Sequence, residues 1–410
     1  MPILKKWVIR FSFIVCLTLF LMGCVYQNRT RITQLSELNG KIYLATEDGN
    51  FKSYDIERNQ FKKITAFKGY QITKIIPGNK SLILEARKIK EDKLETHEII
   101  YFMTEQEELV NSINILFSGI KLFNSILISS DDSYVYALRN DFNRNTNDKT
   151  EFVLRSFRYD RQTKERIENH FNDDSNLVVR DIFDDDSYSW YACYRNPVAT
   201  HWTTVEGNLI VVRKDKITSE QKLITLGNDA FKQGVYITGD GNNIWVFGKN
   251  SKENIFKISK KEFTYETVRM PLMTYQIKEI PSLKDNAYLW FLSSNLVKIS
   301  RNRFEGKEFL NRFDKHDLKT IQIPLPEGVV NEGPAVADEK FIWIAQSQLK
   351  SFVPGFPVSY SPYLVRVSKT DSSIKVLPVE TTFGEGISNI KRSFIGYMTW
   401  IYWAIVGGPG

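Results

Sequence analysis

The sequence predicts an all-β fold, and three observations support this class. Residues 40–63 form a short meander pattern in which β-branched and aromatic runs alternate with turn signals. Strand cores of the same kind then recur roughly every 40 to 56 residues, the repeat length of four-stranded propeller blades. These cores are apolar at consecutive positions, as in strands that neighbours cover on both faces. We therefore expect a β-propeller of four-stranded antiparallel blades.

The first repeat shows the unit most clearly. An apolar run at Lys41–Ala45 is followed by a turn at Glu47–Gly49, a strand at Phe51–Asp55 and a second turn at Glu57–Asn59. A meander this short cannot bury its apolar faces alone, so it requires copies packed on either side. The later cores lie at Ser81–Glu85, Ser133–Leu138, Tyr188–Ala192, Asn243–Phe247, Ala287–Phe291, Phe341–Ala345 and Met398–Tyr402.

Weaker strands follow the cores and are expected to be the outer strands of the blades. They lie at Asn254–Ile258, Tyr265–Val268 and Leu296–Ser300. Trp245, Trp290 and Trp343 occupy equivalent places in three cores, so we expect all three side chains to be buried.

The turn residues of the first repeat carry a family resemblance. Ala45-Thr46, Asp48-Gly49 and Tyr54-Asp55 follow one another as an apolar strand, a Thr-x-Asp-Gly turn and a Tyr-Asp strand. In this order they resemble the repeat of the two-component-regulator and ligand-sensor propellers. Later copies keep the strand and lose the turn residues, so the resemblance implies a fold and little about function.

The end of the chain bears on the number of blades. Seven copies are complete, and an eighth begins at Ile387–Ile390, continues through Phe394–Val406 and has no outer strands. We expect residues 387–406 to form a hairpin packed in the ring beside the first blade, since two exposed apolar strands would otherwise favour aggregation. The prediction is seven full blades plus a partial eighth. Deletion of residues 387–410 is expected to expose both ends of the ring.

The N-terminus has the pattern of a lipoprotein signal peptide. Lys5, Lys6 and Arg10 precede an apolar segment at Phe11–Leu21 that is short for a membrane span. The segment ends in Leu21-Met-Gly-Cys24, which resembles the bacterial lipobox, and this implies that the Cys24 sulfur carries the lipid. The alternative is an N-terminal anchor helix with an incidental cysteine. The expected organisation is a signal peptide at 1–23, a lipid-anchored tether at 24–30 and a β-propeller domain at 31–410.

The tether and the charge indicate where the domain lies. Only about six residues separate Cys24 from the first strand near Arg31, a reach of roughly 20 Å, so the domain lies close to the lipid. Val25 is not Asp, and the lipoprotein resemblance then implies the outer membrane, facing the periplasm, in a Gram-negative host. The net charge of +7 includes the three cations of the signal segment. The remaining charge of about +4 is too small and too mixed to favour nucleic acid.

The cysteines agree with this organisation. Cys16 lies in the signal segment and Cys24 is the lipid acceptor, which leaves Cys193 alone. No intrachain disulfide is therefore expected, and Cys193, between two tyrosines in a strand-like run, is predicted to be a buried and inert thiol.

The sequence contains no catalytic motif that we recognise, and no cofactor site is predicted. His97, His170, His201 and His316 fall in different repeats, without a second ligand at metal-binding spacing. Asp141–Asn147 has oxygen side chains at alternate positions like a calcium loop, but Thr146 replaces the glycine that such a loop requires. A polar hairpin between blade strands explains it better.

Two acidic segments are interpreted as turns. Thr238–Trp245 resembles the Asp-box of sialidase-type propellers, with Asn242 in place of a glycine, so Asp240 is expected to form a turn and Trp245 to lie in the blade core. Asp184-Asp-Asp186 is most simply a solvated loop before a strand.

The segment Ser351–Tyr363 is the candidate partner-binding loop. It is expected as an insertion between two strands of one blade that combines prolines with the aromatic residues Phe352, Phe356, Tyr360 and Tyr363. This composition suits contact with a protein or peptide. A self-packed Ω-loop is the alternative.

Two functions from different classes remain. In the first, the chain is a membrane-anchored envelope lipoprotein whose propeller binds another envelope protein, a peptide or a ligand as a scaffold. In the second, it is a propeller enzyme, a lyase or glycan hydrolase, with its site in the central funnel. The absence of a catalytic motif from the sequence favours the scaffold.

Overall fold

The computed structural model describes residues 31–379, apart from single residues and short connecting segments, the longest of which are 116–125 and 351–358. The elements in this part of the chain are β-strands, with one short 3-10 helix, η1 (Thr65–Phe67). The all-β prediction is therefore confirmed. Within the same residues there is no helix with the length and apolar composition that a bilayer crossing requires.

The strands of the described residues form seven antiparallel sheets of four or five strands, and one two-stranded sheet. The first three sheets are β1 (Ile32–Leu38), β2 (Lys41–Thr46), β3 (Phe51–Asp55), β4 (Gln60–Lys63); β5 (Tyr70–Pro77), β6 (Ser81–Lys90), β7 (Lys93–Thr104), β8 (Leu109–Ile115); and β9 (Ile126–Ser130), β10 (Tyr134–Arg144), β11 (Thr150–Asp160), β12 (Arg166–His170). The fourth and fifth are β13 (Leu177–Asp184), β14 (Tyr188–His201), β15 (Thr204–Asp215), β16 (Gln221–Gly227); and β17 (Gln233–Gly239), β18 (Asn243–Lys249), β19 (Asn254–Ser259), β20 (Tyr265–Arg269). The sixth is β21 (Gln276–Glu279), β22 (Tyr288–Ser294), β25 (Glu308–Asp314), β26 (Thr320–Pro324), and the seventh is β27 (Val329–Val330), β28 (Ala335–Ala337), β29 (Phe341–Lys350), β30 (Ser359–Ser368), β31 (Ile374–Pro378).

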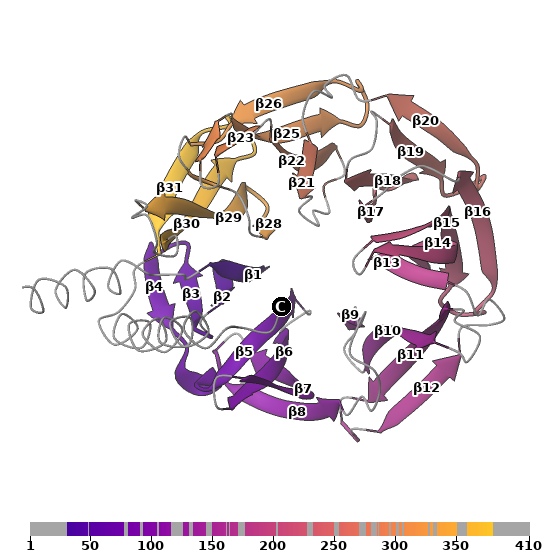
Figure 1. Ribbon diagram of the computed structural model, residues 1–410, viewed down its shortest axis with the longest axis horizontal. Coiled ribbons are helices and arrows are strands. Elements are labelled where there is room, and N and C mark those ends of the chain that lie inside the picture. The colour runs from indigo at the N-terminus through magenta and orange to yellow at the C-terminus, as the bar shows by residue number, and fades with distance from the viewer. Residues whose placement is uncertain are drawn as a thin grey trace, which may run out of the picture.

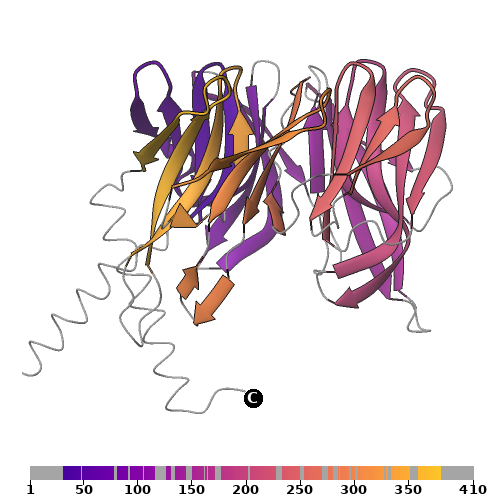
Figure 2. The same cartoon turned by 90° about the horizontal axis from the view of Figure 1, so that it is seen from above.

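The sheets stand around a central opening with the first strand of each sheet nearest the centre (Figure 1). The strands of each sheet are paired in chain order, although not always with the immediately following strand. The turns from first to second and from third to fourth strand therefore lie on one face, which we call the turn face. Figure 2 shows these turns gathered along one side of the ring. The arrangement is that of a β-propeller.

The second strand of each sheet explains the apolar runs of the sequence. In β2, Ile42 and Leu44 pack toward the seventh sheet, whereas Tyr43 and Ala45 pack toward the second. Both faces of the strand are thus covered, and consecutive positions must be apolar.

The three tryptophans predicted to be core residues lie on second strands and are buried. Trp245 is on β18, Trp290 on β22 and Trp343 on β29. Cys193, on β14, is a buried free cysteine, as predicted. Burial raises the pKa of its thiol, because the thiolate would be desolvated.

One predicted outer strand is placed elsewhere by the structure. Leu296–Ser300 was expected as an outer strand of its blade, but β23 (Val297–Ser300) pairs with β24 (Arg303–Glu305) in a separate hairpin. The third strand of the sixth sheet is β25, which pairs with β22 along seven residue pairs. The hairpin is an insertion between β22 and β25 and projects away from the turn face (Figure 2).

The first and seventh sheets contact each other directly. Ile42, Leu44 and Tyr54 of the first sheet share a buried cluster with Trp343 and Leu364 of the seventh. The rings of Tyr54 and Trp343 are 5.6 Å apart between centroids. The hairpin expected at residues 387–406 lies outside the described residues.

Candidate functional site

An aspartate turn precedes the second strand in four sheets. In the fifth sheet, Asp240 Oδ1 accepts hydrogen bonds from the backbone N–H of Asn242 (2.8 Å) and Asn243 (2.7 Å), and Oδ2 accepts one from Trp245 Nε1 (2.6 Å). The same side-chain pair recurs as Asp185 with Trp190, Asp285 with Trp290 and Asp338 with Trp343. Asp240 is thus a turn-former, as the sequence predicted.

The sequence analysis recognised only one of these four turns. The common signal is an Asp five residues before a Trp, and the glycine of the Asp-box is not needed for it. The acidic run at 184–186 is explained in the same way, because Asp185 holds Trp190 and only Asp186 is fully exposed. The run is therefore more than a solvated loop.

A second recurring turn joins the third and fourth strands. Its first residue, which we call the anchor, accepts a backbone hydrogen bond from the residue four positions later, and that later residue has a positive φ. The anchors and their left-handed residues are Asp215 with Ser219, Ser259 with Phe263, Asp314 with Leu318 and Ser368 with Ser372.

An arginine two residues before the anchor links one sheet to the next. Arg213 on β15 lies over the ring of Tyr188, and its Nη1 donates to the carbonyl of Lys260 in the fifth sheet (2.8 Å). Arg312 on β25 lies over Tyr288, and its Nη1 donates to the carbonyl of Lys369 in the seventh sheet (3.2 Å). In both cases the guanidinium thus donates a hydrogen bond to a backbone carbonyl in the anchor turn of the following sheet.

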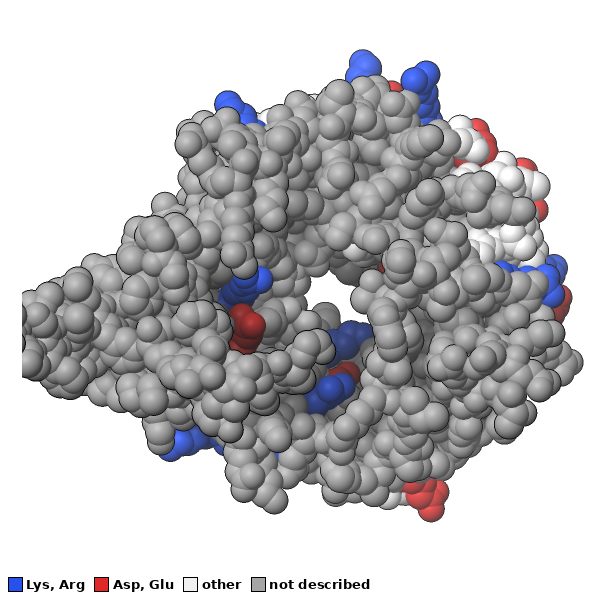
Figure 3. Space-filling view, in the orientation of Figure 1, with Lys and Arg blue, Asp and Glu red and all other residues white. Residues whose placement is uncertain are grey.

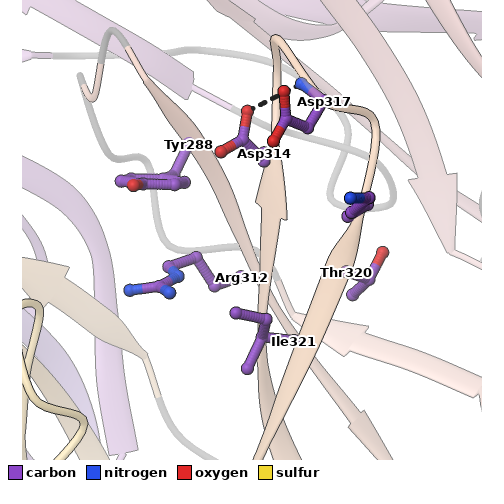
Figure 4. Close-up of a pocket in the computed structure, with 7 residues that line it drawn as sticks. Tyr288, Arg312, Asp314, Asp317, Thr320 and Ile321 are labelled. Atoms are coloured by element: carbon purple, nitrogen blue, oxygen red, sulfur yellow. Dashed lines mark hydrogen bonds between the residues drawn. The ribbon is translucent and has the colours of Figure 1, made fainter.

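A pocket of about 370 Å³ lies beside Arg312. It is lined by Tyr288, Arg312, Asp314, Asp317, Lys319, Thr320 and Ile321, which all belong to the sixth sheet and its turn. Figure 4 shows the Tyr288 ring on one side of the Arg312 guanidinium, with the two aspartates beyond them. The Cζ atom of Arg312 is 4.8 Å from the Tyr288 ring centroid.

Several polar groups of this pocket are already engaged, whereas Thr320 Oγ1 is buried without a hydrogen-bond partner. Asp314 Oδ1 accepts hydrogen bonds from the backbone N–H of His316 (2.8 Å) and Asp317 (3.0 Å). The Asp317 carboxylate lies 2.9 Å from His316 Nδ1, and that hydrogen bond raises the pKa of His316 and lowers that of Asp317. Ile321 forms an apolar wall, with 49% of its surface exposed. The pocket can therefore offer a cationic plane, an aromatic edge and an apolar wall to a binding group.

The central channel carries a second group of charges. Several innermost strands have a β-bulge at the same place, at Thr33, Thr73, Arg180, Gly234 and Lys278. A bulge redirects the side chains beside it. Figure 3 shows Lys, Arg, Asp and Glu side chains within the central opening.

Asp181 and Lys74 are the most perturbed groups of these strands. Asp181 on β13 accepts a hydrogen bond from the N–H of Ile237 on β17 (2.9 Å). Burial raises the pKa of Asp181 to about 6. The backbone hydrogen bonds and the charge of Lys74 lower this pKa but do not outweigh the burial. Burial also lowers the pKa of Lys74 on β5, against the opposing charges of Glu85 and Asp181. A carboxyl group and an amine with displaced pKa values could exchange a proton there.

The other sequence-predicted residues do not gather at either place. The backbone of His97, His170 and His201 lies in β7, β12 and β14, and His316 is an exposed turn residue. Asp141 and Asn143 lie in β10 opposite Val153 and Glu151, so their alternation belongs to a strand pair and not to a calcium loop. Within the described ranges no three acidic, His or Cys residues lie close enough to hold a metal ion.

The candidate partner-binding loop is only partly described. Strand β30 begins at Ser359, so Tyr360 and Tyr363 are strand residues, paired with Leu349 and Gln346 of β29. Phe352 and Phe356, like Cys24, lie outside the described residues. The insertion at 351–358 does join two strands of one sheet, as expected.

Comparison with known proteins shows no family for this chain. No family model matches the chain, and no curated protein matches it. Among solved structures, the β-propeller domain of Cps50 (Swd1) from Myceliophteria thermophila has a TM-score of 0.49 at 8% identity, covering 85% of this chain and 98% of that one. A Synechocystis apocarotenoid oxygenase mutant has a TM-score of 0.44 at 10% identity, covering 72% and 71% of the two chains. A chain of the mitotic checkpoint complex has a TM-score of 0.42 at 12% identity, covering 87% and 88%.

Proposed function

We propose that this chain is a lipid-anchored scaffold of the cell envelope, in which a seven-bladed propeller binds a protein or peptide partner. The anchoring part of the proposal is supported by the lipobox that ends in Cys24 and by the short tether at 24–30. The seven blades correspond to the seven sheets of the described residues, of which the first and last pack directly together.

The observation that carries the binding part is the pocket beside Arg312. Its walls are held by hydrogen bonds to the backbone, at Asp314 and at the carbonyl of Lys369, so its shape is set before a partner arrives. A preformed pocket avoids the ordering cost that weakens association. The aromatic insertion with Phe352 and Phe356, together with Tyr360 and Tyr363, is a second candidate contact at the other end of the strands.

Site-specific photocrosslinking in cells tests the binding proposal. A benzoylphenylalanine at position 321, at the pocket wall, should give a discrete adduct in the membrane fraction. The control is position 217 on the same turn face, where Ile217 is 92% exposed and lies in a different sheet. Equal adduct yields at positions 321 and 217 would contradict a specific partner. The same conclusion would follow if neither position 321 nor a second probe at position 352 gave an adduct.

Lipidation has its own test. Cys24→Ala should leave a product that no longer partitions into detergent, because stable anchoring requires the acyl chains. Unchanged partitioning in the variant would refute the anchor.

The enzyme alternative is favoured by one observation, the raised pKa of Asp181 beside Lys74 in the channel. A lyase or glycan hydrolase with its site there predicts that Asp181→Asn abolishes product release from envelope glycans and leaves the crosslink at 321 intact. If the parent protein releases no product from envelope glycans, this alternative is refuted.

A further inference from the structure

We infer that the pocket beside Arg312 is a socket for one aromatic side chain of the bound partner. The inference rests on the proposed function, because it names the group through which the scaffold recognises its partner. It is drawn from a comparison of equivalent places between neighbouring sheets of this same chain.

The equivalent place between the fourth and fifth sheets is occupied by an aromatic side chain of the protein itself. The guanidinium of Arg213 lies between two rings there, with its Cζ atom 4.7 Å from the centroid of Tyr188 and 4.7 Å from that of Phe263. Tyr188 belongs to the arginine's own sheet, whereas Phe263 comes from the anchor turn of the next sheet. Phe263 also packs against Trp190, at 6.1 Å between centroids.

The anchor turn of the seventh sheet matches that of the fifth residue by residue. Phe263 N–H donates to the carbonyl of Ser259 (2.9 Å), and Ser372 N–H donates to the carbonyl of Ser368 (3.1 Å). Phe263 has φ of 54° and Ser372 has φ of 59°. Each turn also accepts the arginine of the preceding sheet, through the carbonyl of Lys260 or Lys369. Ser372 therefore stands where Phe263 stands, and it carries no ring.

A related turn, in which Glu107 N–H donates to the carbonyl three residues earlier at Thr104, also reaches the preceding sheet. In the second sheet, Glu107 lies in the turn between the third and fourth strands and has φ of 66°. Its Oε1 accepts a hydrogen bond from Ser53 Oγ of the first sheet (2.8 Å), and Ser53 lies two residues before Asp55 as Arg312 lies two before Asp314. The turn residue and the third-strand residue are thus partners across the boundary between sheets.

The size of the side chains explains why the cavity is here. At the boundaries where the preceding sheet has a buried tryptophan, we compare two residues of the following sheet, namely the residue before the anchor turn and the left-handed residue. The pairs are Ile258 and Phe263, Phe313 and Leu318, Tyr54 and Asn59, and Val367 and Ser372. At each of the first three boundaries at least one of the two residues is large, whereas Val367 and Ser372 are both small. We attribute the cavity of about 370 Å³ to that deficit, and its volume falls at the lower end of the ligand-pocket range of about 300 to 1,000 Å³.

The chemistry of the pocket selects an aromatic group. One face of the Arg312 guanidinium is covered by Tyr288, and the proposal places the partner's ring on the other face. A guanidinium plane is weakly hydrated and stacks on aromatic faces. The cations Arg312 and Lys319 are matched in the lining by the carboxylates of Asp314 and Asp317, so a carboxylate or phosphate would gain little net attraction there. Aromatic anchors that enter such pockets carry much of the energy of protein interfaces.

The test compares aromatic and aliphatic probes on matched variants by saturation-transfer NMR. N-acetyltryptophanamide and N-acetylphenylalaninamide should receive saturation from the full chain, and N-acetylleucinamide should receive much less. Ser372→Phe supplies the missing ring from within, so the aromatic signal should disappear while the melting temperature rises. Phe263→Ser opens the equivalent socket over Arg213 and should increase the signal about twofold, because the free energy of stacking on an arginine should be similar at both places.

The inference is overturned if Ser372→Phe binds the aromatic probes as the parent does, or if the leucine probe binds equally well. If Ser372→Phe does not fold, Ile321→Glu serves instead, since residue 321 is exposed and a carboxylate there would occupy Arg312; retained aromatic binding in that variant overturns the inference. A crosslink at 321 without aromatic-probe binding would refute the socket and leave the scaffold standing. Binding of the aromatic probes without any crosslink at 321 would refute the scaffold and leave the aromatic pocket standing.

Discussion

At the scale of single residues, the stability of the ring depends on polar groups that hold aromatic ones. The Nε1–H group of each of four buried tryptophans donates to an aspartate that also accepts two backbone N–H groups of its turn. Buried donors require partners, so each such aspartate serves both the turn and the core. Burial raises the pKa of Asp240, but the hydrogen bonds from Trp245, Asn242 and Asn243 outweigh it and leave the pKa lowered.

We expect Asp240→Ala to lower the free energy of unfolding by about 1 to 3 kcal/mol, because it leaves the buried Trp245 Nε1–H without an acceptor. Trp245→Ala should cost about 3 to 5 kcal/mol through lost burial and the cavity left behind. Urea denaturation of both variants measures these values. The control is Asp186→Ala, at an exposed position, and an equal loss there would show that the Asp240 turn has no special role.

The pKa of Asp181 predicts a pH dependence of stability. Burial raises the pKa of Asp181 in the folded state to about 6, compared with 3.8 for an exposed Asp in the unfolded chain. The folded state therefore holds this proton more tightly than the unfolded chain. The contribution of Asp181 to stability therefore falls as the pH rises from about 4 to about 6 and is constant above that. Asp181→Asn should be stabilising relative to the parent at pH 7 and much less so at pH 4.

Melting temperatures of the parent and Asp181→Asn across this pH range test the assignment. Since other carboxyl groups titrate in both proteins, the difference between the two curves isolates Asp181. Parallel curves from pH 4 to pH 7 would mean that the carboxyl is not desolvated in the folded protein.

At the scale of the elements, the turns from third to fourth strand repeat one backbone conformation without glycine. The left-handed position is occupied by Asn59, Ser219, Phe263, Leu318 and Ser372. Asn tolerates this conformation best, whereas a β-branched side chain is strained there.

Ser219 is exposed, so substitution there reports the backbone alone. Ser219→Val should destabilise the protein by roughly 1 to 2 kcal/mol, and Ser219→Asn should be neutral or slightly stabilising. Chemical denaturation distinguishes the two. Equal stability of the Val and Asn variants would show that the turn adapts its conformation.

At the scale of the whole molecule, the ring is joined by packing between the first and last sheets. Among the strands between residues 32 and 378, the order within each sheet follows the chain, so none of these sheets combines strands from the first and last blades. The junction depends on side chains such as Tyr54 and Trp343, together with the hydrogen bond from Lys375 Nζ to Asn59 Oδ1 (3.3 Å). An apolar seam of this kind can hold a ring if it stays dry and well packed.

We expect Tyr54→Ala to open this seam, because it removes the ring against Trp343. Limited proteolysis should then become faster at both ends of the described chain, and the melting temperature should fall. Because the seam is already packed, a chain ending at residue 386 should stay soluble, in contrast to the expectation from the sequence. Insolubility of that truncation, with Tyr54 intact, would show that residues 387–406 contribute to the ring.

Much of the architecture was predictable from the sequence. Consecutive apolar residues at Ile42–Ala45 or Ile244–Phe247 predict a strand covered on both faces, and their spacing predicts a series of four-stranded antiparallel sheets. The burial of Trp245, Trp290 and Trp343 and of Cys193 followed from the same pattern. The insertion at Val297–Glu305 was misplaced, because a short alternating strand has the same pattern whether it joins a blade or a separate hairpin.

The candidate pocket was decided by tertiary structure alone. Arg312 and Ser372 are 60 residues apart in the chain, and nothing local relates a small turn residue in one sheet to a guanidinium in the preceding one. What relates them is the packing of neighbouring sheets, and the proposed socket requires that the small side chain of Ser372 leave a volume over Arg312. Local sequence determines which residues turn, pair and avoid water, because these depend on periods of a few residues; a cavity depends on the sum of side-chain volumes across a boundary, and only the assembled ring defines that sum.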